Sequence, residues 1–389
     1  MKFFRTLQRA WCAVLLAGLA ACGGGGDSGT LRLALTDAPS CGFDAVNLTI
    51  QKVRVHQSSG ASDADSGWSE VNLNPARRLN LLNLRNGVLF ELGQTPLPTG
   101  KYTQLRLILA DNSSADPLAN SVLPTGGAEV ALKTPSGQQS GVKANIDIDI
   151  AANKMADFVI DLDACKSIVS AGNSGQFLLK PVVNVLARYI SGVAGFVDSV
   201  VANGSTSASL QQGGVAIKAT APDSSGRFLL QPVVPGRYVL VLTAPGRSTV
   251  VVTKVDVLAD TVSTVGAAGV PLSLPPSPTG TVSGNAPANT LVRVLQPLTP
   301  ALTDGTPTTV EVVGRFVDST TGNYSYPLPV NPPLLAPYVA APGPLVFTAD
   351  TAAAGKYSLA ASLTGFLDKL SVLAPLSAGS TITTNFNFP

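Results

Sequence analysis

The sequence predicts an all-β protein built from tandem β-sandwich domains. Its 37 glycines and 29 prolines are spread along the chain as turn residues between short runs rich in Val, Leu and Thr. Within such runs, apolar residues alternate with other residues, as in 31–35 and 146–150, which is the period of a strand with one buried face. The chain has 389 residues, which is too many for one core and indicates two or three domains.

The N-terminus has the pattern of an export signal. Three basic residues precede an apolar run, Trp11–Leu19, which is too short to span a bilayer but fits the core of a signal peptide. The segment Leu19-Ala20-Ala21-Cys22 resembles a bacterial lipobox, which implies that residues 1–21 are removed and that Cys22 is diacylated. Cleavage by an ordinary signal peptidase after a small residue in 20–26 is the alternative.

The charge of the mature chain limits the classes of partner. Residues 1–21 hold three of the 26 Lys and Arg residues and no acidic residue, so 23 basic side chains would remain against 24 acidic ones. A chain so close to neutrality has no electrostatic basis for binding nucleic acid or an anionic membrane surface. The predicted membrane contact is therefore the lipid on Cys22 alone.

The segment after the lipobox predicts where the protein is held. Residues 22–29 form a short Gly-rich tether with little reach. In enteric bacteria an aspartate directly after the lipidated cysteine retains a lipoprotein at the inner membrane, and here that residue is Gly23. By resemblance to that rule, we expect a lipid anchor in the outer membrane, with the protein facing the periplasm or the cell surface.

Two cysteines remain after Cys12 leaves with the leader and Cys22 is lipidated. They are Cys41 and Cys165, and in an exported chain the simplest prediction is a disulfide between them. Two unpaired buried thiols are the alternative. No cysteine spacing fits a metal cluster.

The strand pattern in residues 43–84 predicts two irregular features. Apolar residues in 46–50 and then in 53–55 lie in opposite phase, which indicates a β-bulge near Gln51 and Lys52. Residues 58–67 form a polar loop. Arg78–Leu84 fits either a helical turn or a strand.

Several separated motifs resemble the domain-of-unknown-function-4382 family. They include Leu33-Ala34-Leu35-Thr36-Asp37-Ala38-Pro39, Gly100–Leu107 and Asp163–Val169, in the order that the family has them. We therefore expect a family-like β domain over 30–189. The resemblance implies an exported, often lipid-anchored bacterial domain and supplies no known activity.

The second half resembles another family. The motifs Gly195-Phe196-Val197-Asp198, Gly226–Leu230 and Pro235–Leu240 are similar to the carboxypeptidase regulatory-like, or transthyretin-like, module, which implies a β-sandwich over 190–274. A Pro-rich hinge at 275–278 follows. Related Gly-x-Tyr turns then indicate a third, diverged β-sandwich over 279–389, with 327–344 as a long inserted loop.

Catalytic chemistry has little support in the sequence. His56 is the only histidine, and no Gly-x-Ser-x-Gly motif supplies a nucleophile for it. We therefore predict no catalytic residue. Trp68, the only tryptophan after the leader, is expected to be a core residue rather than a platform for sugar stacking.

Four aspartates form the main candidate metal site. Asp147 and Asp149 share one face of a predicted strand, and Asp161 and Asp163 share a face of the next. If the two strands pair as a hairpin, the four carboxylates converge and could bind calcium; a solvated sheet face is the alternative. Residues 63–67 resemble a fragment of a calcium loop that lacks its third acidic position and distal glutamate.

The function expected from these features is non-catalytic. The sequence favours a lipid-anchored envelope protein that binds or scaffolds a glycan or another envelope protein. A carboxylate-based polysaccharide hydrolase in the N-terminal domain is one alternative. An accessory or regulatory module for a neighbouring envelope enzyme is the other, and it depends on family analogy alone.

Overall fold

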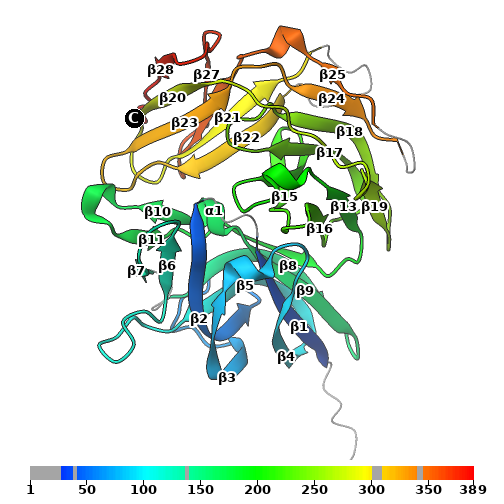
Figure 1. The fold of residues 1–389 in the computed structure, drawn as a ribbon. Coiled ribbons are helices and arrows are strands. Elements are labelled where there is room, and N and C mark those ends of the chain that lie inside the picture. The colour runs from blue at the N-terminus through cyan, green and yellow to red at the C-terminus, as the bar shows by residue number, and fades with distance from the viewer. Residues whose placement is uncertain (1–27, 38–41, 136–139, 300–308, 340–344) are drawn as a thin grey trace, which may run out of the picture.

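The prediction of an all-β fold is confirmed. The computed structural model describes residues 28–37, 42–135, 140–299, 309–339 and 345–389. In these segments the strands form sheets that pack in pairs as β-sandwiches, and the helices are single turns (Figure 1). The turns are α1 (Ala164–Ser167), η1 (Leu81–Leu84), η2 (Gly172–Ser174), η3 (Ser199–Val201) and η4 (Thr351–Ala353).

The first β-unit packs a four-stranded sheet on an eight-stranded sheet. The four-stranded sheet has the order β12 (Val183–Ala187), β9 (Met155–Leu162), β1 (Ser28–Asp37) and β4 (Phe90–Pro98). The larger sheet has the order β10 (Ile168–Ser170), β11 (Phe177–Leu179), β7 (Val130–Lys133), β6 (Ser121–Pro124), β2 (Phe43–His56), β5 (Gly100–Leu109) and β8 (Val142–Ile150), with β3 (Ser69–Asn80) also paired to β2. One apolar core lies between them.

The predicted bulge is present in β2. The pairing of β2 with both neighbours shifts between Ile50 and Lys52, so Val53 and Val55 face the core although their phase differs from that of 46–50. Residues 78–84 combine both predicted structures, because β3 ends at Asn80 and η1 follows. The Asn80 side chain caps η1 by accepting a hydrogen bond from the backbone N–H of Leu82.

The second β-unit has a three-stranded and a six-stranded sheet. The smaller one has the order β16 (Arg227–Leu230), β13 (Gly192–Phe196) and β19 (Val262–Val265). The larger one has the order β15 (Val215–Thr220), β14 (Ser207–Gln212), β17 (Gly236–Thr243), β18 (Val250–Val257), β24 (Leu334–Pro337) and β25 (Thr348–Ala349). A separate apolar core lies in this unit.

The last two strands of that sheet correct the expectation of an inserted loop at 327–344. This segment contains the end of β23 and all of β24, which pairs in parallel with β18. Val239, Val241 and Val251 also pack on Leu298 and Val310 from later in the chain. The larger sheet is therefore buried on both faces, which explains the continuous valine runs of β17 and β18.

The third β-unit packs a three-stranded sheet on a four-stranded sheet. The first has the order β23 (Asn323–Pro329), β20 (Thr279–Asn285) and β28 (Thr381–Thr383). The second has the order β22 (Thr309–Phe316), β21 (Leu291–Pro297), β26 (Ser358–Ser362) and β27 (Lys369–Val372). Their shared core includes three buried tyrosines, Tyr324, Tyr326 and Tyr357.

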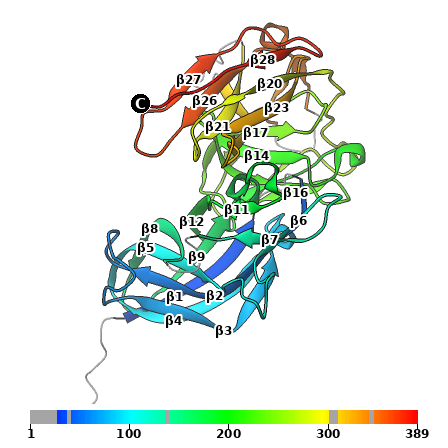
Figure 2. The same cartoon turned by 90° about the vertical axis from the view of Figure 1, so that its left-hand side faces the viewer.

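The three units form an elongated molecule with the second and third units together at one end of the first (Figure 2). The segment predicted as a hinge lies on the second unit, because the N–H of Ser248 donates to Pro275 O and the N–H of Ser277 donates to Gly246 O. A buried ion pair joins the first two units: Lys218 Nζ on β15 lies 2.9 Å from Asp161 Oδ2 on β9, and the two side chains are only 3% and 7% exposed.

Alanine substitutions at two glycines of the second unit, Gly195 and Gly269, test how tightly its core is packed. A Cβ on Gly195 would lie 2.4 Å from the ring of the buried Phe228 and 2.5 Å from Val265 O, so Gly195→Ala should lower the free energy of unfolding by about 1–3 kcal/mol. Gly269 has no atom within 4 Å of that position, and Gly269→Ala is the matched control, with little expected change. Chemical denaturation measures both, and equal stability of the two variants would contradict the packing.

The Lys218–Asp161 ion pair is tested by a double-mutant cycle. Lys218→Met should lower the free energy of unfolding by about 3–5 kcal/mol, because the Asp161 carboxylate would remain buried without its cation. Adding Asp161→Leu should recover much of this loss. As a control, Arg237→Met breaks an exposed pair with Asp256 and should cost less than about 1 kcal/mol. A Lys218→Met protein as stable as the wild type would contradict this assignment.

Candidate functional site

The place where all three units meet contains a cluster of buried and partly buried charged side chains. The single turn α1 of the first unit lies between β15 of the second and β22 of the third (Figure 1). Two hollows open there, with volumes of about 200 Å³ and 360 Å³. Asp163, Lys166 and Glu311 line both hollows and separate one from the other.

Asp163, Lys166 and Glu311 form the wall between the hollows, and the first two belong to the turn α1 and its N-cap. Asp163 caps this turn, because its side chain accepts a hydrogen bond from the backbone N–H of Lys166 at 2.9 Å. Lys166 Nζ then lies 3.1 Å from Glu311 Oε1 on β22 and 3.9 Å from Asp163 Oδ2. Arg293 Nη1 on β21 approaches the other oxygen of Glu311 at 3.6 Å. One carboxylate of the third unit is thus shared between two cations.

Burial and neighbouring opposite charges shift the pKa values of these groups in opposite directions. Burial raises the pKa of the Asp163 carboxyl, and the neighbouring Lys166 ammonium only partly offsets this. Burial also acts to lower the pKa of Lys166, but the carboxylates of Glu311 and Asp163 outweigh it, so the pKa of Lys166 is raised. Lys166 therefore remains an ammonium, and its role in the wall is to neutralise acids.

Hydrogen bonds hold the second and third units in register at the same place. The Gln211 side chain on β14 donates from Nε2 to Glu311 O and accepts from the Glu311 N–H, both at 2.8 Å. A side-chain amide therefore pairs with the backbone of β22 as a neighbouring strand would. This fixes the direction in which the Glu311 carboxylate extends toward α1.

The smaller hollow is a cleft between the second and third units, and two cations on its walls are free of acidic partners. Arg247 lies on the second unit and Arg315 lies on β22, and neither takes part in an ion pair among the described residues. Arg247 Nη1 donates to Leu274 O, at 3.3 Å. Thr249 is 1% exposed, and its Oγ1 has no hydrogen-bond partner in the described part of the chain.

The predicted convergence of four aspartates is wrong. Strands β8 and β9 do not pair with each other: β8 pairs with β5, whereas β9 pairs with β1 and β12 in the opposite sheet. Asp147 and Asp149 are therefore on the exposed face of β8, where Asp147 pairs with Lys101 at 2.8 Å. Asp161 and Asp163 lie at the junction of the units instead. Residues 151–154 connect two sheets rather than two adjacent strands, which is why the hairpin prediction fails.

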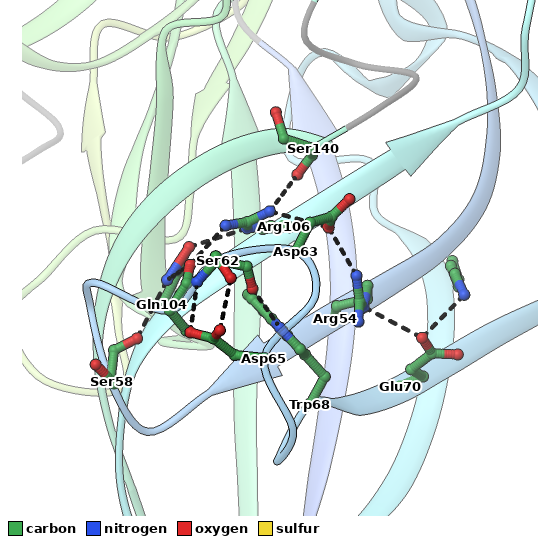
Figure 3. A network of polar contacts seen from close by, with 12 residues as sticks. Arg54, Ser58, Ser62, Asp63, Asp65, Trp68, Glu70, Gln104, Arg106 and Ser140 are labelled. Atoms are coloured by element: carbon green, nitrogen blue, oxygen red, sulfur yellow. Dashed lines mark hydrogen bonds and ion pairs between the residues drawn. The ribbon is translucent and has the colours of Figure 1, made fainter.

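Among the residues that the structure describes, no other acidic cluster takes the place of the predicted calcium site. Within the described ranges, no group of three or more His, Cys, Asp or Glu residues is arranged to hold a metal ion. The acidic side chains of the loop at 58–67 have protein partners instead. Asp63 Oδ1 lies 2.8 Å from Arg54 Nη1 and 3.0 Å from Arg106 Nη1, and Asp65 accepts hydrogen bonds from Ser62 (Figure 3).

Trp68 is neither a core residue nor an open sugar platform. The guanidinium carbons of Arg54 and Arg106 lie 4.6 Å and 4.7 Å from the centroid of its half-buried ring. The two arginines face each other directly across β2 and β5, so their like charges would repel. Asp63 and the Trp68 ring compensate for this repulsion, and the network of Figure 3 closes the loop over the sheet.

His56 has a structural environment. It ends β2, as predicted, and its Nδ1 accepts a hydrogen bond from the Ser58 N–H at 2.8 Å. Its Nε2 therefore carries the proton and lies 3.0 Å from Ser66 O, where it can donate. Both ring nitrogens are bound to the backbone of the same loop.

The predicted anchor and disulfide remain predictions. Cys22 and Cys41 lie outside the described residues, while Cys165 is the second residue of α1 and lines the smaller hollow. In the part of the chain that the structure describes, no helix is both long and apolar enough to cross a bilayer.

Sequence patterns did not single out most of the residues at the junction, namely Lys166, Gln211, Lys218, Arg247, Arg293, Glu311 and Arg315. One signal was available for Glu311, which is the only glutamate after residue 190. The basic residues had no distinguishing pattern, because their partners lie in other units. Asp161 and Asp163 were predicted as calcium ligands with Asp147 and Asp149, and the structure places them at the junction of the units, apart from those two residues.

Several solved structures show low similarity to this chain. The type II cohesin–X-dockerin complex of Acetivibrio cellulolyticus is 20% identical, with coverage of 22% of this chain and 58% of that chain and a TM-score of 0.19. The chain thus spans less than two thirds of that protein's length. The major pilin BcpA of Bacillus cereus is 12% identical, with coverage of 92% and 99% and a TM-score of 0.15. The major pilin SpaA of Corynebacterium diphtheriae is 10% identical, with coverage of 93% and 99% and a TM-score of 0.18.

No curated protein matches the chain. A family match confirms the resemblance expected for the N-terminal region. The match ends before β12, the strand that completes the four-stranded sheet of the first unit. Residues 28–181 match the family described as a domain of unknown function, DUF4382.

Proposed function

We propose that the mature protein is a lipid-anchored envelope protein that binds or scaffolds a glycan or another envelope protein. Cys22 would be its acylated first residue. The observation that carries the proposal is the position of β1. This strand begins at Ser28, at the end of the first unit that is farthest from the other two units (Figure 1). A chain anchored six residues earlier would hold the cleft between the second and third units away from the bilayer.

The domain organisation belongs to the same proposal. The first domain would cover 30–189, a carboxypeptidase regulatory-like sandwich 190–274, and a diverged sandwich 279–389, with 275–278 between them. The separate apolar cores around β13–β19 and β20–β28 support two modules of this kind. A disulfide between Cys41 and Cys165 would staple the start of β2 to α1, close to the junction of the units.

A binding role fits the chemistry of the junction better than catalysis does. Its buried acids are engaged by cations, with Asp161 on Lys218 and Glu311 on Lys166 and Arg293. A carboxylate held in this way is poorly placed to act as a general acid or base, because the cation occupies the oxygen atoms that a substrate proton would have to reach. An open cleft with two cations that have no acidic partner among the described residues is suited to holding a ligand.

The anchor is tested by a cysteine substitution in the full precursor. Cys22→Ser should move the protein from the membrane fraction to the soluble fraction of cells, because no acyl chain can be attached. Cys12→Ser is the matched control and should leave the protein with the membranes, since Cys12 lies in the leader. The mass of the wild-type N-terminal peptide measures acylation directly. An unmodified Cys22, or a Cys22→Ser protein that stays with the membranes, would contradict the proposal.

The binding role is tested separately with the anchored wild-type protein. Purified envelope glycans and detergent-solubilised envelope proteins would be passed over the immobilised protein. Retention of either class above the level seen with a denatured sample supports the proposal. No retention of either class would contradict it.

A further inference from the structure

We infer that the cleft between the second and third units is a binding site for a carboxylated sugar, a uronic-acid unit of a glycan. This inference rests on the proposed binding function and names its ligand and site. The cleft is walled by strands of both units and floored by α1 of the first unit. Junctions between domains are common positions for ligand sites.

Charge selects an acidic ligand. Three cations line the cleft, Lys166, Arg247 and Arg315, against two carboxylates, Asp163 and Glu311. Lys166 is already engaged by both carboxylates. The guanidinium groups of Arg247 and Arg315 remain for a ligand, one on each of two walls. Guanidinium groups match the geometry of a carboxylate better than any other side chain does.

The remaining polar lining selects a ligand that carries hydroxyl groups. Ser205 and Ser207 on the second unit and Ser325 on the third line the cleft. The buried Thr249 Oγ1, which lacks a partner among the described residues, is part of the same lining. A buried hydroxyl without a hydrogen bond is costly, so a ligand hydroxyl that pairs with Thr249 would gain affinity.

Size and the apolar lining restrict the ligand to a small ring. The cleft volume of about 200 Å³ is below the range of about 300–1,000 Å³ that is usual for drug-sized ligands. Pro245, Pro327 and Pro329 contribute apolar surface on which the C–H face of a sugar ring can pack. One acidic monosaccharide unit fits these limits, with the rest of a glycan extending through the open side.

The test is calorimetric titration of the full mature chain with glucuronate and galacturonate, compared with glucose and galactose. We expect the acidic sugars to bind at least about 10-fold more tightly than their neutral counterparts, the gain expected from one charge-assisted hydrogen bond. Arg315→Gln and Arg247→Gln should each abolish this preference, and Thr249→Val should weaken binding of both acidic sugars. Thermal melting of each variant verifies that it is folded.

Arg237→Gln is the matched control. Arg237 is an exposed arginine of the second unit that pairs with Asp256 on the neighbouring strand and does not line the cleft, so its loss should leave sugar binding unchanged. Equal binding of acidic and neutral sugars would overturn the inference, as would no binding of either or an unchanged preference in both cleft variants. Binding of N-acetyl-Ala-Ala in place of the sugars would also overturn it, because the carboxylate would then belong to a peptide.

The outcomes also separate this inference from the proposed function. If the uronates fail to bind while envelope material is still retained by the anchored protein, the inference fails and the binding role stands. If the uronates bind but Cys22→Ser leaves the protein with the membranes, the site stands and the anchor fails.

Discussion

The cost of leaving a charge buried without a partner is the constraint on which the arrangement of the three units depends. Asp161 and Lys218 are both almost fully buried and come from different units, as do Lys166 and Glu311. In each pair, either group alone would be an isolated charge in a poorly solvated place. The units therefore keep their positions because separating them without hydrating these groups is unfavourable.

This constraint also shapes the cleft. Because the Glu311 carboxylate already pairs with Lys166 and Arg293, it does not pair with Arg247 or Arg315. These two arginines line the cleft instead. The pairing of Gln211 with the backbone of β22 fixes the spacing of the two walls without adding charge. A preorganised cleft of this kind loses little entropy when a ligand enters, which favours binding.

The network around Trp68 shows the same principle at the opposite end of the first unit. Two arginines that face each other across adjacent strands would repel, and the protein places a carboxylate and an aromatic ring between them. The result is a closed loop rather than an open site. Like charges brought together by strand register need compensation wherever they occur, and here the loop supplies it.

Local features of the fold could be predicted because their causes are local. The alternation of Leu31, Leu33 and Leu35 and the change of phase around Gln51 depend on neighbours a few residues apart, and the structure has the strand and the bulge that they indicate. The predicted hairpin of 146–150 with 158–162 was wrong for a related reason. Alternation shows which face of a strand is buried, but it does not show which strand lies beside it.

The sequence by itself therefore determined the all-β class and many of the strands with their buried faces, whereas the export signal before Cys22 stays a prediction. Only the tertiary structure decided that Asp161 meets Lys218 and that Glu311 meets Lys166, residues separated by 57 and 145 positions in the sequence. The physical reason is the separation along the sequence over which each effect acts. Strand periodicity follows from the backbone geometry of adjacent residues, whereas a charge pair forms between whatever side chains the packing of separate sheets brings together.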